Sequence, residues 1–352
     1  MKRVVCIILA ALLVCAALPV FAEGDKPYAG ETITVFNWYE YIDPAVIDQF
    51  EEETGITVNY AMFTTNEEMY AQLEHSSGAY DVIFPSDYII ERLIKEDALE
   101  PLNYDNIPNA AGVIDWMKTP AYDPESTYSV PYMWGTLGLI YNTDLVSEPI
   151  TSWESIFSGE YKGNVLMMDS VRDTLATALS YLGYSINTRD EDELEEAEDL
   201  LIKQKQDGIV AGYFVDETKD KMVAGEAAIA LIYSGDALYS LEKADNLVYV
   251  VPDEGSNVWL DGMCIPKGSK HKEAAECFIN FLCREDIARA NMDFIYYSTP
   301  IQAVVDGMDE EELANETLNP PQDVVDRCTF FNDVSEDGEL YEEIWMDIRM
   351  AH

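Results

Sequence analysis

The sequence predicts an α/β fold with two lobes, each built on a mixed, mostly parallel sheet that helices flank. Strand and helix patterns alternate from residue 32 onward, and repeated βα order is typical of parallel sheets. The 352 residues are too many for one simple core, so two lobes are expected. Aromatic and acidic residues recur together where a strand ends and a helix begins. These junctions are where ligands bind in open α/β sheets, so the sequence predicts a cleft there.

The N-terminal segment, residues 1–22, has the composition of a secretory signal peptide. Two basic residues precede an apolar run from Val4 to Val20, and the segment ends in Ala22. A helix that spans a membrane needs about 20 apolar residues, and this run is shorter. We therefore expect an exported protein that begins near Glu23, in the periplasm or on the extracellular face of the cytoplasmic membrane.

The chain is strongly acidic, since 67 Asp and Glu residues against 21 Lys and Arg residues give a formal net charge of −46. A charge of this sign argues against nucleic acid as a partner and raises the local concentration of cations near the surface. Acidic runs such as Glu191–Asp199 and Asp309–Glu312 are also explained by a solvated surface. The charge therefore favours a cationic ligand without locating its site.

Four of the six cysteines follow the predicted signal peptide: Cys264, Cys277, Cys283 and Cys328. Their spacing matches no zinc-binding pattern. The apolar surroundings of Cys264 and Cys277 favour buried free thiols over a disulfide. Because the chain also has only three histidines, we expect no metal site and no cofactor.

The first lobe is expected to contain residues 32–136 and 260–305. Apolar residues alternate at Ile33 and Val35 as in a short strand, and Asp43-Pro44 then opens a helix. Gly55 ends that helix, because glycine tolerates the left-handed conformation that follows a last helical turn. The next expected elements are a strand at Ile56–Tyr60, a helix from Asn66 to Gly78, a strand at Tyr80–Phe84 and a helix at Ile89–Glu96.

A long surface connection is expected from Asn103 to Pro131, where regular patterns give way to Pro, Asn, Tyr and Asp. The strand Leu137–Tyr141 is then predicted to cross into a second lobe, formed by residues 137–259 and 306–352. Val258–Gly262 is predicted to be the return crossing. Two crossings between lobes form a hinge, and hinge closure over a solute is a known switching motion.

The remaining elements follow from the spacing of apolar residues. Expected strands lie at Asn164–Met168, Ala228–Ile232 and Leu247–Val251, and expected helices at Leu194–Leu201, Glu273–Leu282 and Glu285–Asn291. A last helix carries Leu340, Ile344, Trp345 and Ile348 with amphipathic spacing, which predicts one buried face.

The residues at the junctions have the chemistry of an amine-binding site. They are Trp38, Tyr41, Ser86, Tyr88, Asp169, Asp173, Tyr233, Asp236, Trp259, Asp261, Tyr296 and Tyr297. Ring faces attract cations by roughly 0.5–2 kcal/mol each, and a carboxylate about 4 Å from an ammonium gains on the order of 4 kcal/mol before desolvation. Helix N-termini by themselves favour anions, but acids crowd these ends and a cation is therefore predicted. Burial in the core is the alternative explanation for the rings.

A secreted carbohydrate-acting enzyme is the alternative from a different functional class. Asp169 and Asp173 are compatible with the paired carboxylates of a glycosidase, and aromatic platforms also suit sugars. However, the chain has no Gly-rich phosphate loop, no nucleophile elbow and no HExxH helix. The sequence therefore favours a binding protein over an enzyme.

Several motifs together resemble the bacterial spermidine/putrescine-binding proteins, the exported solute-binding components of polyamine ABC transporters. The motifs are Phe36-Asn37-Trp38 with Tyr41, Phe50 to Gly55, Gly78-Ala79-Tyr80-Asp81, Pro85-Ser86-Asp87-Tyr88, Tyr128 to Gly135, Trp259-Leu260-Asp261 and Tyr297-Ser298-Thr299-Pro300. The resemblance runs from about Thr32 to the C-terminal helix. It implies the type II periplasmic binding protein fold, a polyamine ligand, a membrane permease as partner and a monomer.

The resemblance also implies a role for each site residue. Trp38, Tyr41, Ser86 and Tyr88 would line the cleft from the first lobe, and Trp259 and Tyr297 would sandwich the methylene chain. Asp261 would bind an amine, and Asp173 matches an acidic position used for a terminal amine. Tyr233 stands where the family often has Trp, and Asp236 resembles an acid of putrescine-preferring relatives.

Two positions depart from the spermidine-binding pattern. Ser170 occupies an acidic position of that pattern, and Phe331 stands where a Gln is seen. Both changes remove polar partners for the third nitrogen of spermidine. The choice between putrescine and spermidine thus remains open, and another organic cation, such as a quaternary amine or an amino acid, is the alternative ligand.

Overall fold

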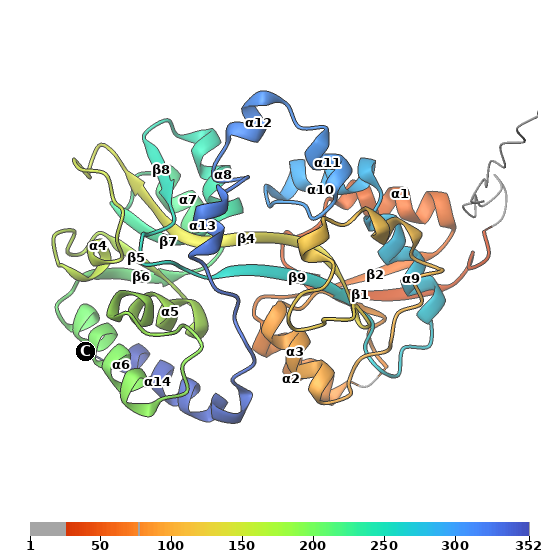
Figure 1. Ribbon diagram of the computed structural model, residues 1–352, viewed down its shortest axis with the longest axis horizontal. Coiled ribbons are helices and arrows are strands. Elements are labelled where there is room, and N and C mark those ends of the chain that lie inside the picture. The colour runs from red at the N-terminus through yellow and green to blue at the C-terminus, as the bar shows by residue number, and fades with distance from the viewer. Residues whose placement is uncertain (1–25, 77, 352) are drawn as a thin grey trace, which may run out of the picture.

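A computed structural model describes residues 26–76 and 78–351 (Figure 1). The predicted signal peptide at residues 1–22 lies outside the described residues. Within them, nine strands form one mixed sheet in the order β2-β1-β3-β9-β4-β7-β5-β6, and β8 pairs with β4. The strands are β1 (Thr32–Trp38), β2 (Thr57–Phe63), β3 (Val82–Ile83), β4 (Ser129–Asn142), β5 (Val165–Met168), β6 (Val210–Phe214), β7 (Ile229–Tyr233), β8 (Leu247–Val250) and β9 (Val258–Cys264).

Helices cover both faces of this sheet (Figure 1). They are α1 (Pro44–Thr54), α2 (Asn66–His75), α3 (Asp87–Lys95), α4 (Glu154–Phe157), α5 (Val171–Leu182), α6 (Glu191–Gln206), α7 (Glu217–Val223), α8 (Ser234–Lys243), α9 (Lys272–Leu282), α10 (Glu285–Ile295), α11 (Gln302–Asp306), α12 (Glu310–Ala314), α13 (Gln322–Asp326) and α14 (Gly338–Met350). Short 3₁₀ turns lie at Pro108–Gly112, Asp115–Met117 and Ser335–Asp337. The alternation of strands and helices confirms the predicted α/β class.

Local sequence signals explain where the first helix begins and ends. The Asp43 side chain accepts a hydrogen bond from the backbone N–H of Ala45, and Pro44 occupies the first turn. Gly55 then adopts a φ of 74° and its N–H donates to the Glu51 carbonyl, which ends α1 as predicted.

The sheet is parallel on both sides of its centre and antiparallel at the centre. β1 runs parallel to β2 and β3, and β5 runs parallel to β6 and β7. The long strands β4 and β9 pair antiparallel with each other, and they pass through the middle of the molecule in Figure 1. β3 pairs antiparallel with β9, and β7 and β8 pair antiparallel with β4. The two predicted crossings are therefore adjacent strands that support each other.

The expected loop to Pro131 is wrong at its end, because β4 already begins at Ser129. Proline lacks the N–H that a central strand donates, which made a loop the natural expectation. The structure accommodates Pro131 with a register shift between Pro131 and Met133 in the pairing with β9. The strand expected at Tyr80–Phe84 is also shorter, since only Val82–Ile83 pair.

Alternation along the strands divides the buried side chains between two faces. Ile33 and Val35 of β1 pack in a cluster with α1, α9 and α10, whereas Phe36 packs with α2 and α3 on the other face. In the same way Leu139 of β4 packs with α5, α6 and α14, and Ile140 packs with α7 and α8. The structure thus has one pair of apolar clusters around β1 to β3 and another around β5 to β8.

The C-terminal helix and the cysteines complete the core. Ile344 and Ile348 of α14 are buried in the cluster of α5 and α6, which confirms the predicted amphipathic face. All four cysteines after the predicted signal peptide are free thiols in the described part of the chain. Cys264 is buried as expected, but Cys277 is only partly buried. Burial raises the pKa of Cys277 to about 11, which favours the protonated thiol at neutral pH.

We expect Gly138→Ala to lower the free energy of unfolding by about 1–3 kcal/mol, the usual penalty of overpacking. A Cβ atom at this position of β4 would lie 2.5 Å from the Val250 carbonyl oxygen and 2.6 Å from Tyr249 Cζ. The carbonyl belongs to the neighbouring strand β8 and cannot retreat without disturbing the β4–β8 pairing.

Urea unfolding of Gly138→Ala and Gly338→Ala measures how much each substitution lowers the free energy of unfolding. Gly338→Ala is the matched control, because its Cβ atom would meet no described atom within 4 Å. If Gly138→Ala and Gly338→Ala had the same stability, the close approach of β8 to β4 would be refuted.

Candidate functional site

Several predicted site residues lie at junctions between strands and helices, but Trp259 and Asp261 lie inside the central strand β9 and not at the junction that the sequence analysis expected. Tyr41 follows β1, Ser86 and Tyr88 stand at the start of α3, and Asp173 lies in the first turn of α5. Tyr233 is the last residue of β7. The other members are Asp236 in the first turn of α8, Trp259 and Asp261 on β9, and Tyr297 after α10.

Asp261 is the first acid of this group and is only 5% exposed. Its Oδ2 atom accepts a hydrogen bond from the Tyr41 hydroxyl at 2.8 Å. Its Oδ1 atom is buried and has no hydrogen-bond partner among the described residues. Burial raises the pKa of Asp261 to about 7, although the Ser86 and Tyr41 hydroxyl groups lower it. This carboxylate therefore retains an unused acceptor in a poorly solvated place.

Asp173 forms the second such group. Its Oδ2 atom accepts hydrogen bonds from the Tyr233 hydroxyl at 2.8 Å and from Ser170 Oγ at 2.5 Å. Burial raises the pKa of Asp173, while Ser170, Tyr233 and the charge of Arg172 lower it. The Ser170 hydroxyl thus donates a hydrogen bond that stabilises the Asp173 carboxylate. Ser170 is the residue that the sequence analysis expected to be acidic in a spermidine-binding site.

Asp236 forms the third group. Its Oδ2 atom accepts a hydrogen bond from the Tyr297 hydroxyl at 3.1 Å. Its Oδ1 atom lies 3.5 Å from Lys219 Nζ. Burial raises the pKa of Asp236 to about 6, and the charge of Lys219 limits the rise. Each of the three acids is therefore paired with a tyrosine, and we call them the tyrosine–carboxylate pairs: Tyr41–Asp261, Tyr233–Asp173 and Tyr297–Asp236.

Aromatic rings join the three pairs into one site. The Tyr297 ring meets the Tyr41 ring at 5.7 Å and the Trp259 ring at 5.1 Å, in both cases edge to face. The Trp259 ring also meets the Tyr233 ring at 6.0 Å. Since these rings come from four separate segments, the structure brings together Tyr41, Tyr233, Trp259 and Tyr297 as one aromatic wall.

Two glycines provide the space that this wall requires. A Cβ atom at Gly135 of β4 would lie 2.7 Å from Trp259 Cζ2, and Gly135 is the partner of Trp259 in the β4–β9 register. A Cβ atom at Gly235 would lie 2.4 Å from Tyr297 Cδ1. Neither contact is possible for a larger residue without moving the ring, so these glycines fix the positions of Trp259 and Tyr297.

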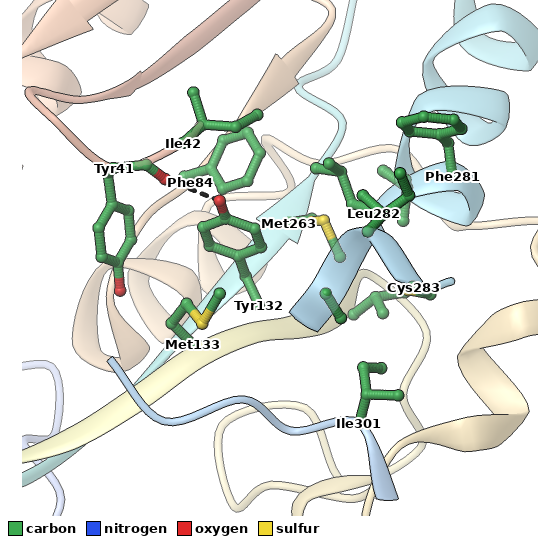
Figure 2. Close-up of a cluster of buried hydrophobic side chains, with 14 of the residues drawn as sticks. Tyr41, Ile42, Phe84, Tyr132, Met133, Met263, Phe281, Leu282, Cys283 and Ile301 are labelled. Atoms are coloured by element: carbon green, nitrogen blue, oxygen red, sulfur yellow. Dashed lines mark hydrogen bonds between the residues drawn. The ribbon is translucent and has the colours of Figure 1, made fainter. Parts of the chain in front are cut away.

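The backbone of Tyr41 is held by the apolar cluster beside the site. Tyr132 Oη donates a 2.7 Å hydrogen bond to the Tyr41 carbonyl, and the Tyr132 ring contacts the Phe84 ring at 4.7 Å. Figure 2 shows that the Tyr41 ring points away from Phe281 and Leu282, while its carbonyl faces Tyr132. The cluster therefore anchors the main chain and leaves the Tyr41 hydroxyl for Asp261.

Trp38 and Tyr88 lie at the border of the group. The Trp38 indole N–H donates to the Phe84 carbonyl at 2.8 Å, and its ring packs on Phe63. Trp38 is thus connected to Tyr41 through Phe84 and Tyr132. The Tyr88 hydroxyl donates to Glu67 Oε1 at 2.8 Å.

A buried arginine lies on the Tyr88 side of the site. The guanidinium of Arg172 lies 5.1 Å from the Tyr88 ring centroid and 4.4 Å from the Phe331 ring centroid. Phe331 therefore packs on a cation of the protein itself.

The sequence analysis missed three charged members of this region. Asp87 is 1% exposed, and burial raises its pKa well above the ordinary value. Lys219 of α7 and Arg172 of α5 bring positive charge to the site. Asp87 was visible in the Pro85–Tyr88 motif, but no local pattern marks the two cations, because their partners lie in distant segments.

The geometry gives no support to the paired carboxylates of a glycosidase. Asp169 is partly exposed and accepts a hydrogen bond from Arg349 Nη1 at 2.7 Å, whereas Asp173 is buried against Tyr233. No cluster of His, Cys, Asp and Glu with the geometry of a metal site occurs among residues 26–76 and 78–351. Over the same residues, no helix is both long and apolar enough to cross a membrane.

The chain is similar to proteins of known class over nearly its whole length. The family of bacterial extracellular solute-binding proteins matches residues 45–321. The spermidine/putrescine-binding periplasmic protein of Salmonella typhimurium is 33% identical over 340 residues, 96% of this chain and 97% of that protein. The putrescine-binding periplasmic protein PotF of Escherichia coli is 29% identical and covers 89% of each chain.

A solved structure supports the same assignment. It is the spermidine/putrescine ABC transporter substrate-binding protein PotD from Streptococcus pneumoniae, in complex with calcium and HEPES. It is 34% identical, has a TM-score of 0.79, and the match covers 91% of this chain and 99% of that chain. Both the sequence and the fold therefore show that this chain belongs to the bacterial extracellular solute-binding proteins.

Proposed function

We propose that the protein captures a protonated polyamine, putrescine or spermidine, and delivers it to the permease of an ABC transporter. One observation carries this proposal: three carboxylates, of which Asp173 and Asp261 are buried and Asp236 is partly buried, each accept a tyrosine hydroxyl and share one aromatic wall. Buried carboxylates need cationic partners, and the rings offer apolar faces to the methylenes between two amines. The names of the relatives from Salmonella typhimurium and Escherichia coli support the same ligand class.

The proposed ligand-binding residues are those that the sequence analysis named. They are Trp38, Tyr41, Ser86, Tyr88, Asp173, Tyr233, Asp236, Trp259, Asp261 and Tyr297. Asp261 is the best placed to accept an ammonium, since its Oδ1 atom is buried without a partner among the described residues. A quaternary amine has no N–H group and cannot donate a hydrogen bond to a carboxylate. The carboxylates of this site therefore favour a primary or secondary amine over a quaternary amine.

We also propose that the ligand lies between two lobes joined at β4 and β9. The separate apolar clusters around β1–β3 and β5–β8 support two lobes, formed by residues 32–136 with 260–305 and by residues 137–259 with 306–352. Met308 and Leu318 pack with the first cluster, which favours a last boundary nearer residue 330. Tyr297 and Glu40 of the first lobe contact Asp236 and Lys219 of the second, which supports a closed arrangement that hinge opening would separate.

Export and partnership complete the proposal. The family is extracellular, and the relatives are periplasmic proteins, which supports export by the signal sequence at residues 1–22. The protein would work as a monomer that docks on its membrane permease after closure. No catalytic role is proposed, because the matched family and relatives are binding proteins.

Replacing Asp261 should weaken binding strongly. We expect Asp261→Asn to reduce the affinity for the bound polyamine at least tenfold, about 1.4 kcal/mol, because the amide removes the charge while it still accepts from Tyr41. Isothermal titration calorimetry with putrescine, cadaverine, spermidine and spermine measures the effect.

Asp48→Asn is the matched control, since Asp48 is exposed on α1 and the substitution removes the same charge far from Asp261. Unchanged affinity of Asp261→Asn would remove Asp261 from the site. If the unmodified protein released no heat with any of the four amines, the proposed function would be wrong.

Binding should weaken as the pH falls from 8 to 6. The pKa of Asp261 is about 7, and only its ionised form attracts an ammonium. Primary amines stay protonated over this range, so the loss comes from the carboxylate. A group with a pKa near 7 is about 90% ionised at pH 8 and about 10% at pH 6, which predicts about a tenfold loss from Asp261 alone.

Calorimetry at pH 6, 7 and 8 tests this dependence. Asp261→Asn should show a much flatter profile over the same range, since its amide does not titrate. A flat profile for the unmodified protein, or equal slopes for both proteins, would contradict the assignment of the titration to Asp261.

A further inference from the structure

Lys219 is an unusual residue in this acidic site. It lies on α7, its side chain is only 16% exposed, and its ammonium faces two carboxylates. Nζ lies 3.5 Å from Asp236 Oδ1 and donates to Glu40 Oε2 at 3.2 Å. The same atom lies 5.3 Å from the ring centroid of Tyr239.

This environment is what an amine ligand would require. The end of a lysine side chain is a primary ammonium on a four-carbon stem, and the end of a polyamine has the same chemistry. Two carboxylates and an aromatic face are the partners that such a group prefers. Burial lowers the pKa of Lys219, whereas the negative charges of Asp236, Glu40 and Asp216 raise it by more. The net change is a rise in the pKa, so the Lys219 ammonium stays charged.

Asp173 and Asp261 are available to a ligand ammonium, whereas Asp236 is not. Both oxygens of Asp236 are engaged, Oδ2 by the Tyr297 hydroxyl and Oδ1 by Lys219. Asp173 receives hydroxyl donors from Ser170 and Tyr233 on its Oδ2 atom. Asp261 receives the Tyr41 hydroxyl on Oδ2, and its Oδ1 atom has no partner among the described residues. Thus only one of the three pairs already contains an ammonium.

We propose that Lys219 is a specificity-determining residue that acts as a built-in third cation at Asp236, so that the site favours a diamine over a triamine. This inference rests on the proposed function and deepens it. A diamine carries two ammonium groups, which match Asp261 and Asp173. A third ammonium would meet Asp236 already neutralised and would be repelled by Lys219 at close range.

The test compares the affinities for putrescine and spermidine by isothermal titration calorimetry. The variants are Lys219→Met, which keeps an apolar stem without the charge, Lys219→Arg, which keeps the charge, and the double variant Lys219→Met with Asp236→Asn. Lys221→Met is the matched control, since Lys221 lies on the same helix and pairs with Glu226 at 2.9 Å. Thermal unfolding of each variant checks that the fold is retained.

We expect Lys219→Met to raise the affinity for spermidine relative to putrescine by about tenfold or more, since Asp236 gains an unneutralised charge. Lys219→Arg and Lys221→Met should keep the original ratio. The double variant should lose the gain, because the charge that the third ammonium would use is absent.

Three outcomes would overturn the inference. An unchanged ratio in Lys219→Met would show that Lys219 does not select the ligand. An equal gain in Lys221→Met would reduce the effect to general electrostatics, and a gain that survives Asp236→Asn would exclude Asp236 as its origin. If the unmodified protein bound neither amine, the proposed function itself would fail and this inference with it.

Discussion

The structure of the site depends on the hydrogen bonds between tyrosine hydroxyl groups and three carboxylates that are buried or partly buried. A carboxylate removed from water is strongly disfavoured unless donors replace its hydration. Tyr41, Tyr233 and Tyr297 each supply one neutral donor, which orients an acid without cancelling its charge. The raised pKa values of Asp261 and Asp236 indicate that this replacement is incomplete. The protein thus holds acids that gain stability when a cation arrives.

The fold brings the tyrosines and the carboxylates together because the segments that connect strands to helices lie beside the two long central strands, β4 and β9. Trp259 and Asp261 are two residues apart on β9, so they lie on the same face of the sheet. Gly135 on β4 and Gly235 at the start of α8 leave room for the rings of Trp259 and Tyr297. The pairing of β4 with β9 also connects the two sets of apolar clusters. Site and scaffold are therefore built from the same strands.

Much of this arrangement could be predicted from the sequence, because it follows from local patterns. The caps at Asp43 and Gly55 define α1, and the βα order places Tyr41, Tyr88 and Asp173 at junctions. The parts that could not be predicted depend on contacts with distant segments or on a change in strand register that accommodates an unfavourable residue. Pro131 suggested a loop, since the register shift that accommodates it is set by β9. Lys219 and Arg172 meet Glu40 and Phe331, which lie more than a hundred residues away, and Asp236, the other partner of Lys219, lies on a separate helix, so no spacing rule could reveal these contacts.

A structure of the protein with bound putrescine tests the central claim most directly. The account predicts that its two ammonium groups lie within hydrogen-bonding distance of Asp261 and Asp173, with the methylenes packed on the aromatic wall and with Lys219 still on Asp236. Putrescine bound elsewhere, or within this wall but without contact to either carboxylate, would contradict the account.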